Sequence, residues 1–139
     1  MDFKKEFTRI MESAVELALA TSVDSAPNVR IVTFYYDDTK DGAAYIATYN
    51  QSPKTEEFAK NNKVAFTTIP VGSDAVRVTN AIIQKSELTV HDLKDKFISK
   101  FPGFQATYDY AGPTMAIYEI HFKEADVIVG FNNTDKISL

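Results

Sequence analysis

The chain has 139 residues, of which 45% are hydrophobic and 24% are charged, and its formal net charge at pH 7 is -4. This length suits one compact domain over residues 1–139, and the composition excludes intrinsic disorder, which needs few apolar residues and a high net charge. The acidic balance excludes the basic surface that nonspecific nucleic-acid binding requires. No cysteine is present, which excludes thiolate sites, and no metal site is expected. Because no stretch approaches the roughly 18 apolar residues of a membrane-spanning helix, we expect a cytoplasmic protein without nucleic-acid or membrane partners.

The first half of the chain changes from a helical to a strand pattern. Apolar residues recur every three or four positions from Phe3 to Ala18, which predicts a helix over about residues 2–15. Residues 17–23 and 28–36 are rich in apolar, β-branched and aromatic side chains and are predicted strands, joined by a turn over residues 24–27. A second turn leads to a strand over residues 43–49. Successive hairpins predict an antiparallel meander.

The second half begins with a helix start at Ser52-Pro53, a capping residue followed by proline at the first helical position. This helix is predicted to end near residue 61. The remaining predicted elements are strands over residues 63–69 and 75–85, a helix over 90–100, a loop with Pro102-Gly103, and strands over 115–122 and 125–129. Three helices and six or seven grouped strands favour a mainly β chain, an antiparallel barrel with flanking helices.

The segment between the third strand and the second helix carries the strongest candidate for a binding site. The free N–H groups and the dipole at a helix N-terminus attract anions. Lys54 lies in the first turn of this helix, where a cation is easier to understand if a phosphate sits between it and the backbone amides. In the structural alternative, Ser52 is an ordinary cap and Lys54 a solvated surface residue. The residues alone leave both open.

Two arginines in apolar strands need partners. Alternation places Arg30 on the same face as Val32 and Phe34. A guanidinium there pairs with a carboxylate, such as one on a neighbouring strand, or with a ligand phosphate. Arg77 presents the same choice, and its structural alternative is an exposed arginine on the outside of the barrel.

Five segments, taken in order, resemble the pyridoxamine 5′-phosphate oxidase-like family: residues 20–32 (ATSVDSAPNVRIV), 45–48 (YIAT), 52–54 (SPK), 64–66 (VAF) and 76–78 (VRV). The resemblance implies that the barrel is a six- to seven-stranded antiparallel split β-barrel. It also implies FMN bound at a homodimer interface.

The same resemblance assigns residues to the cofactor. Arg30 and Lys54 would bind the phosphate and ribityl end, and the backbone of residues 30–33 would lie beside the flavin ring. Thr48 and Ser52 match positions that help to bind the same tail. The implied cofactor-binding residues are Arg30, Ile31, Val32, Thr33, Thr48, Ser52, Pro53, Lys54 and Arg77.

These implications lead to one hypothesis and two alternatives. The hypothesis is a homodimeric FMN-binding oxidoreductase that exchanges electrons with a small-molecule substrate or electron donor. No residue is identified as an acid–base catalyst, because the flavin supplies the redox chemistry. The first alternative is a noncatalytic module that holds flavin, haem or another cofactor for storage or sensing. The second is a deazaflavin-dependent reductase on the same barrel.

Overall fold

The computed structural model describes all 139 residues. Its helices and strands are α1 (Phe3–Ser13), β1 (Glu16–Val23), β2 (Ala26–Tyr36), β3 (Ala43–Tyr49), α2 (Pro53–Lys60), β4 (Lys63–Thr68), β5 (Ala75–Lys85), α3 (Val90–Lys100), α4 (Phe104–Ala111), β6 (Met115–Phe122), β7 (Glu124–Val129) and β8 (Asn133–Ser138). None of the helices is long and apolar enough to cross a membrane.

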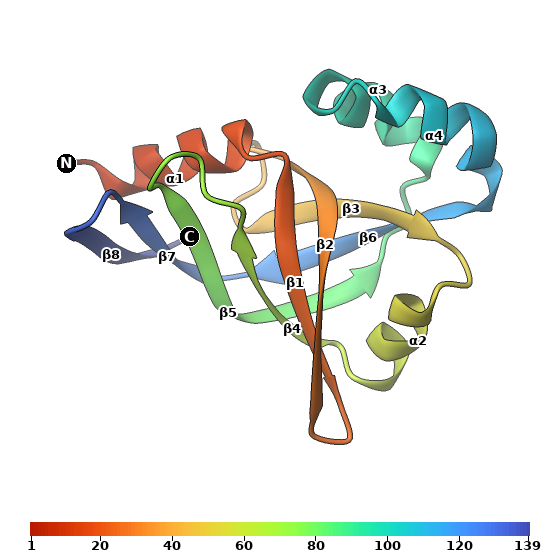
Figure 1. The fold of residues 1–139 in the computed structure, drawn as a ribbon, viewed down its shortest axis with the longest axis horizontal. Helices are drawn as coiled ribbons and strands as arrows, with labels where there is room; N and C mark the ends of the chain where they lie inside the picture. Colours follow the sequence, from red (N-terminus) through yellow and green to blue (C-terminus); the bar gives the residue numbers. More distant parts are fainter.

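Six antiparallel strands close into a barrel. Their order is β4-β1-β2-β3-β6-β5, and β5 pairs with β4 to complete the circle. β7 pairs with β5 and carries β8 at its outer edge, so these two strands extend the sheet beyond the barrel (Figure 1). The main core consists of 22 buried residues from the barrel strands, β7 and two of the helices. The predicted mainly β antiparallel barrel is confirmed.

Two elements towards the C-terminal end were not predicted. The predicted loop with Pro102-Gly103 is present, but a further helix, α4, follows it and starts without a side-chain cap. The strand count is eight, because residues 133–138 form β8. This strand is mostly exposed and polar, so it has no apolar alternation from which it could be predicted.

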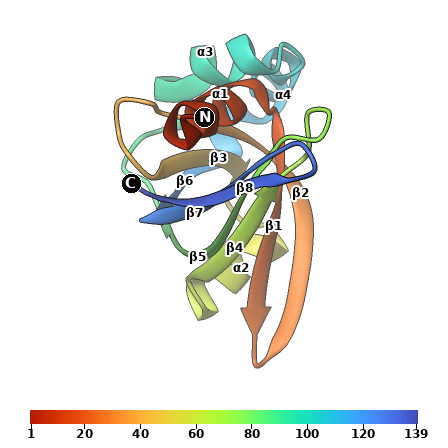
Figure 2. The same cartoon turned by 90° about the vertical axis from the view of Figure 1, so that its left-hand side faces the viewer.

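The β1–β2 hairpin extends beyond the barrel in both views (Figures 1 and 2). The four-residue turn predicted there is wrong, because only Asp24 and Ser25 form it. Both have positive φ, 52° and 66°, as in the two-residue turns that match the twist of paired strands. The strands therefore pair up to Val23 and Ala26, and the hairpin arm reaches past the end of α2.

A second, smaller core lies outside the barrel, where α3 and α4 cover the sheet at the top of Figure 2. Alternate residues of β3 belong to different cores. Ala44 and Ile46 point into the barrel, whereas Ala43 and Tyr45 pack against the two helices. Phe97 of α3 is completely buried in this second cluster. The outer surface of β3 is therefore covered by helices rather than by solvent.

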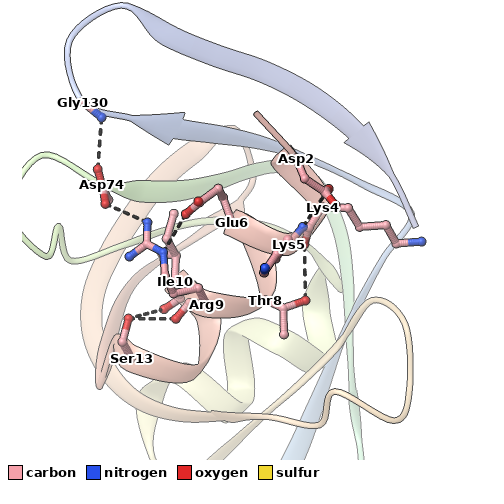
Figure 3. A network of polar contacts seen from close by, with 10 residues as sticks. All are labelled: Asp2, Lys4, Lys5, Glu6, Thr8, Arg9, Ile10, Ser13, Asp74 and Gly130. Carbon is pink, nitrogen blue, oxygen red and sulfur yellow. Dashed lines mark hydrogen bonds and ion pairs between the residues drawn. The ribbon is translucent and has the colours of Figure 1, made fainter.

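Asp74 joins three separate parts of the chain (Figure 3). Its carboxylate accepts hydrogen bonds from Arg9 Nη2 of α1 at 2.8 Å and from the backbone N–H of Gly130 at 3.0 Å. Arg9 also pairs with Glu6 on its own helix. The network ties α1 to the β4–β5 turn and to the β7–β8 turn.

Asp74→Asn is expected to make the melting temperature fall less steeply as the pH is lowered. The hydrogen bond from Arg9, followed by that from Gly130, lowers the pKa of Asp74 below its ordinary value. A lowered pKa contributes stability that is present above the ordinary value and is lost as the pH falls through the folded-state value. Melting temperatures of both proteins between pH 7 and 3 test this, with Asp95→Asn on the exposed surface of α3 as control. Equal acid slopes in wild type and Asp74→Asn would contradict it.

Candidate functional site

A cavity of about 210 Å³ lies between β2, the start of α2 and the α3–α4 pair. Seven of its ten lining residues are hydrophobic. They are Ile31, Val32, Thr33, Ala47, Lys54, Phe97, Phe101, Phe104, Thr107 and Met115. Four of the residues predicted from the sequence, Ile31, Val32, Thr33 and Lys54, therefore meet in one place.

The floor of the cavity is the outer face of β2. Val32 and Phe34 point into the barrel core, so alternation turns Ile31 and Thr33 outward. The opposite wall is aromatic. Phe97 and Phe101 are four positions apart at the end of α3, and Phe104 begins α4. The result is an apolar slot with a β-strand on one side and aromatic rings on the other.

Lys54 gives this apolar cavity a positively charged edge. It lies in the first turn of α2, partly buried, and forms none of the ion pairs of the chain. Burial, and then the nearby charge of Arg30, lower the pKa of its ammonium group. Both effects indicate a cation without a neutralising partner. An anion bound there would supply one.

Two hydroxyl groups, those of Thr48 and Ser52, lie at the junction of β3 and α2, but neither residue lines the cavity. Thr48 Oγ1 and Ser52 Oγ are 3.3 Å apart and share a hydrogen bond. Ser52 occupies the N-cap position of α2, but its side chain forms no cap hydrogen bond, so the predicted side-chain cap is wrong. The hydroxyl is turned towards Thr48 at the end of β3. The two hydroxyls therefore lie at the strand end that leads into the first turn of α2, the turn that carries Lys54 and the positive end of the helix dipole.

Arg30 does not line this cavity. Its Nη2 lies 2.5 Å from Glu57 Oε1, and its Nη1 donates to Thr21 Oγ1 at 2.9 Å. Of the two partners considered above, a carboxylate is present, but it belongs to α2 and not to a neighbouring strand. Hydrogen bonds from Thr21, then Asn28 and Arg30, lower the pKa of Glu57. Arg30 thus fixes α2 against β2, one helical turn from Lys54.

Arg77 and Pro53 also lie outside the cavity. Arg77 is exposed on the outer face of β5, which agrees with the alternative of an exposed arginine on the outside of the barrel. The pairing register places it in one row with Thr67, Ala18 and Ile31, three strands from Ile31 and on the opposite wall of the six-stranded barrel. Pro53 is the first residue of α2 and lines a different surface hollow, next to the β1–β2 hairpin.

The aromatic wall was missed as part of a site. Phe97 and Phe101 share a helical face, and this periodicity predicts only that the face is buried. Phe104 fell in the predicted loop, and Thr107 and Met115 showed no pattern. The three phenylalanines are spaced by four and three residues, and this helical spacing continues through Pro102-Gly103. The spacing could have indicated that all three rings lie on one side.

The side chains of the cavity suit ligand binding rather than proton transfer. Its polar side chains are Thr33, Lys54 and Thr107, and no carboxylate or imidazole lines it. Apolar and aromatic walls suit a flat ring system, and the edge at Lys54 suits an attached anionic group.

The sequence profile described as pyridoxamine 5′-phosphate oxidase-like matches residues 10–134. A search of curated protein sequences finds no match.

Solved structures of similar fold include proteins with different described ligands. General stress protein 26 from Bacillus anthracis is 19% identical, with a TM-score of 0.77 over 100% of both chains. A heme binding protein from Mycobacterium smegmatis is 12% identical, with a TM-score of 0.79 over 99% of this chain, which spans 58% of that one. A FAD-binding protein from Mesorhizobium loti is 17% identical, with a TM-score of 0.66 over 90% of this chain and 91% of the other. At these identities the likeness shows the fold alone.

Proposed function

This chain belongs to the pyridoxamine 5′-phosphate oxidase-like family, and from that membership we propose that it binds FMN and exchanges electrons with a small molecule. The observation that carries the proposal is the cavity in which Lys54 meets the outer face of β2. A flavin combines a flat ring with an anionic tail, which are the two chemical features that this cavity accommodates.

The residues present fit the cofactor. The backbone of residues 31–33 and the phenylalanine wall would hold the ring, and they would keep water from it. Lys54, Ser52, Thr48 and the first turn of α2 would hold the phosphate, which carries close to two negative charges. Arg30 would act as a positioning residue, because its guanidinium is already bonded to Glu57. When bound, the flavin supplies the redox chemistry.

We further propose that a second copy of the chain completes the site. A volume of about 210 Å³ is below the range of about 300–1,000 Å³ for typical ligand pockets, so one chain encloses only part of a flavin. The outer face next to the cavity, on β4, β1 and β2, is largely apolar. It consists of small side chains on β1 and β4 beside exposed ones on β2, namely Ala18, Ala20, Ala65, Val29 and Ile31.

Lys54→Ala is expected to weaken FMN binding by about 1.5–3 kcal/mol, the range for a hydrogen bond to a charged group. This corresponds to roughly a 10- to 150-fold rise in the dissociation constant. Riboflavin, which lacks the phosphate, should bind more weakly to wild type and should be insensitive to the substitution. The measurement is quenching of flavin fluorescence during titration, with Lys60→Ala at the other end of α2 as control. Equal FMN affinity of wild type and Lys54→Ala would remove the phosphate site.

A noncatalytic binding module is the second candidate, and it is favoured by a cavity whose polar side chains are limited to Thr33, Lys54 and Thr107. Reduction of the bound flavin by a nicotinamide donor, followed by reoxidation by an acceptor, would support the oxidoreductase. Tight binding without turnover would support the module. Parallel titrations with a deazaflavin and with haem separate the remaining cofactors, and preference for either over FMN would overturn the FMN assignment.

A further inference from the structure

Phe101 is the least enclosed ring of the aromatic wall. It is 42% exposed, whereas Phe97 and Phe104 are buried. It is the C-cap residue of α3, and its ring lies against the backbone of Gly103 in the short link to α4, where an added Cβ atom would be 3.1 Å from Cζ of the ring. The position of this ring at the edge of the cavity therefore depends on how the end of α3 is held.

Lys100 attaches the end of α3 to the barrel. Its Nζ donates a hydrogen bond to the backbone carbonyl of Met11, in the last turn of α1, at 2.9 Å. The same nitrogen lies 3.6 Å from the centroid of the Phe34 ring. Met11 and Phe34 are completely buried in the main core. The remaining side-chain hydrogen bonds of α3 form its N-terminal cap and a contact with α4. Lys100 thus makes the polar link between α3 and the main core.

The two contacts of Lys100 suit an ammonium group. The carbonyl groups in the last turn of a helix lack intrahelical partners and carry the negative end of the helix dipole, which attracts a cation. The face of an aromatic ring attracts a cation as well. Burial lowers the pKa of Lys100 to about 8, against a smaller opposing effect of Glu12, so the ammonium form predominates at pH 7. The residue is therefore a charged tether between α3, α1 and the barrel core.

We propose that Lys100 is a positioning residue for the flavin ring, because its ammonium group holds the end of α3 and thereby fixes Phe101 at the proposed flavin cavity. This inference rests on the proposed function. Lys100 does not line that cavity, so it acts through Phe101 and not by contact with the cofactor. Without the tether, the Phe101 ring is free to move away from Ile31, which lines the same cavity on β2. The contacts with the flavin ring would weaken, whereas the phosphate contacts at Lys54 on α2 would remain.

Titrations with FMN and with riboflavin separate this role from phosphate binding. Lys100→Met removes the charged donor but keeps a long, unbranched side chain. It is expected to raise the dissociation constants of both flavins by the same factor, on the order of tenfold, as for the loss of one hydrogen bond to a charged group. Lys54→Ala is expected to affect FMN alone. Because affinity is measured on folded protein, a loss of overall stability alone leaves it unchanged.

Three further variants make the titrations specific. Lys100→Arg retains a cation that can donate to the same carbonyl, so it should restore most of the affinity. Lys96→Met, one helical turn earlier on the exposed surface of α3, is the matched control and should leave both dissociation constants unchanged. Lys100→Gln carries a neutral donor and should fall between Lys100→Met and wild type, and it replaces Lys100→Met if that variant does not fold. Flavin affinities equal to those of wild type in the folded Lys100→Met or Lys100→Gln protein would overturn the proposal.

Amide hydrogen exchange tests the tether without any flavin. The Phe101 N–H donates to the Phe97 carbonyl at 2.7 Å, and the Phe104 N–H donates to the Phe101 carbonyl at 2.9 Å. Both amides should exchange on the order of tenfold faster in Lys100→Met than in wild type, and at wild-type rates in Lys96→Met. Unchanged exchange in Lys100→Met would overturn the tether. If wild type bound neither flavin, the proposed function would fail and this role with it, whereas the exchange rates would still show whether Lys100 holds the end of α3.

Discussion

Phe97→Ala is expected to lower the free energy of unfolding by about 3–5 kcal/mol, the usual cost of removing a buried phenylalanine ring. Phe97 is 0% exposed and lies in the small core beneath α3 and α4. Its ring centroid is 5.1 Å from that of Phe104 and 6.4 Å from that of Tyr35, so the ring joins both helices to β2. Urea denaturation of the purified variant measures the loss.

The same substitution is expected to reduce FMN affinity, because Phe97 also lines the proposed flavin cavity. Tyr110→Ala is the matched control. Tyr110 is an aromatic residue of α4 with 91% of its surface exposed, and its removal should change stability by no more than about 0.5 kcal/mol. If both variants lost equal stability, the helices could not be packed on β2 through Phe97. Unchanged FMN affinity in Phe97→Ala would exclude the aromatic wall from the site.

Local patterns in the sequence were sufficient to place one side of the candidate site. The Ser52-Pro53 pair predicted the start of α2. Alternation along β2 predicted that Arg30, Val32 and Phe34 share one face, which leaves Ile31 and Thr33 on the other. These are properties of neighbouring residues. The position of Lys54 beside residues 31–33 follows once β3 returns the chain to the start of α2.

Long-range contacts could not be predicted in the same way. The periodicity of α3 predicts a buried face, but not that this face packs on the outside of β2 and β3. Arg30 illustrates the same limit, since its position on an apolar face indicates that a partner is required without identifying it. The partner, Glu57, lies 27 residues away on a helix, and the hairpin pairing and the path through β3 bring the two together.

Adjacent faces of helix α3 border two different cavities. Phe97 and Phe101 face the proposed flavin cavity, whereas Lys96, Ser99 and Lys100 face a second cavity of about 320 Å³. The hydrogen bond from Lys100 to Met11 also anchors the end of α3 to α1.

Gly42→Ala is expected to destabilise the protein by about 2–5 kcal/mol. Gly42 precedes β3 with φ of +78°, a conformation that costs other residues about 1–2 kcal/mol, and overpacking adds about 1–3 kcal/mol. A Cβ atom there would lie 2.0 Å from the carbonyl oxygen of Phe122. The backbone of Phe122 is held by the hydrogen bond that its N–H donates to the Gly42 carbonyl. The Phe122 ring packs against Phe7 and Phe66.

Gly72→Ala separates the two contributions to this loss. Gly72 has a similar φ of +63°, but nothing lies within 4 Å of the Cβ that the substitution would add. Its expected cost is therefore the conformational part alone, about 1–2 kcal/mol. Urea midpoints of both variants give the difference, which measures the steric overlap with β6. Equal losses of stability in the two variants would mean that the backbone at Phe122 moves to accommodate the added Cβ atom. The close approach of the β2–β3 turn to β6 would then not be a rigid feature of the barrel.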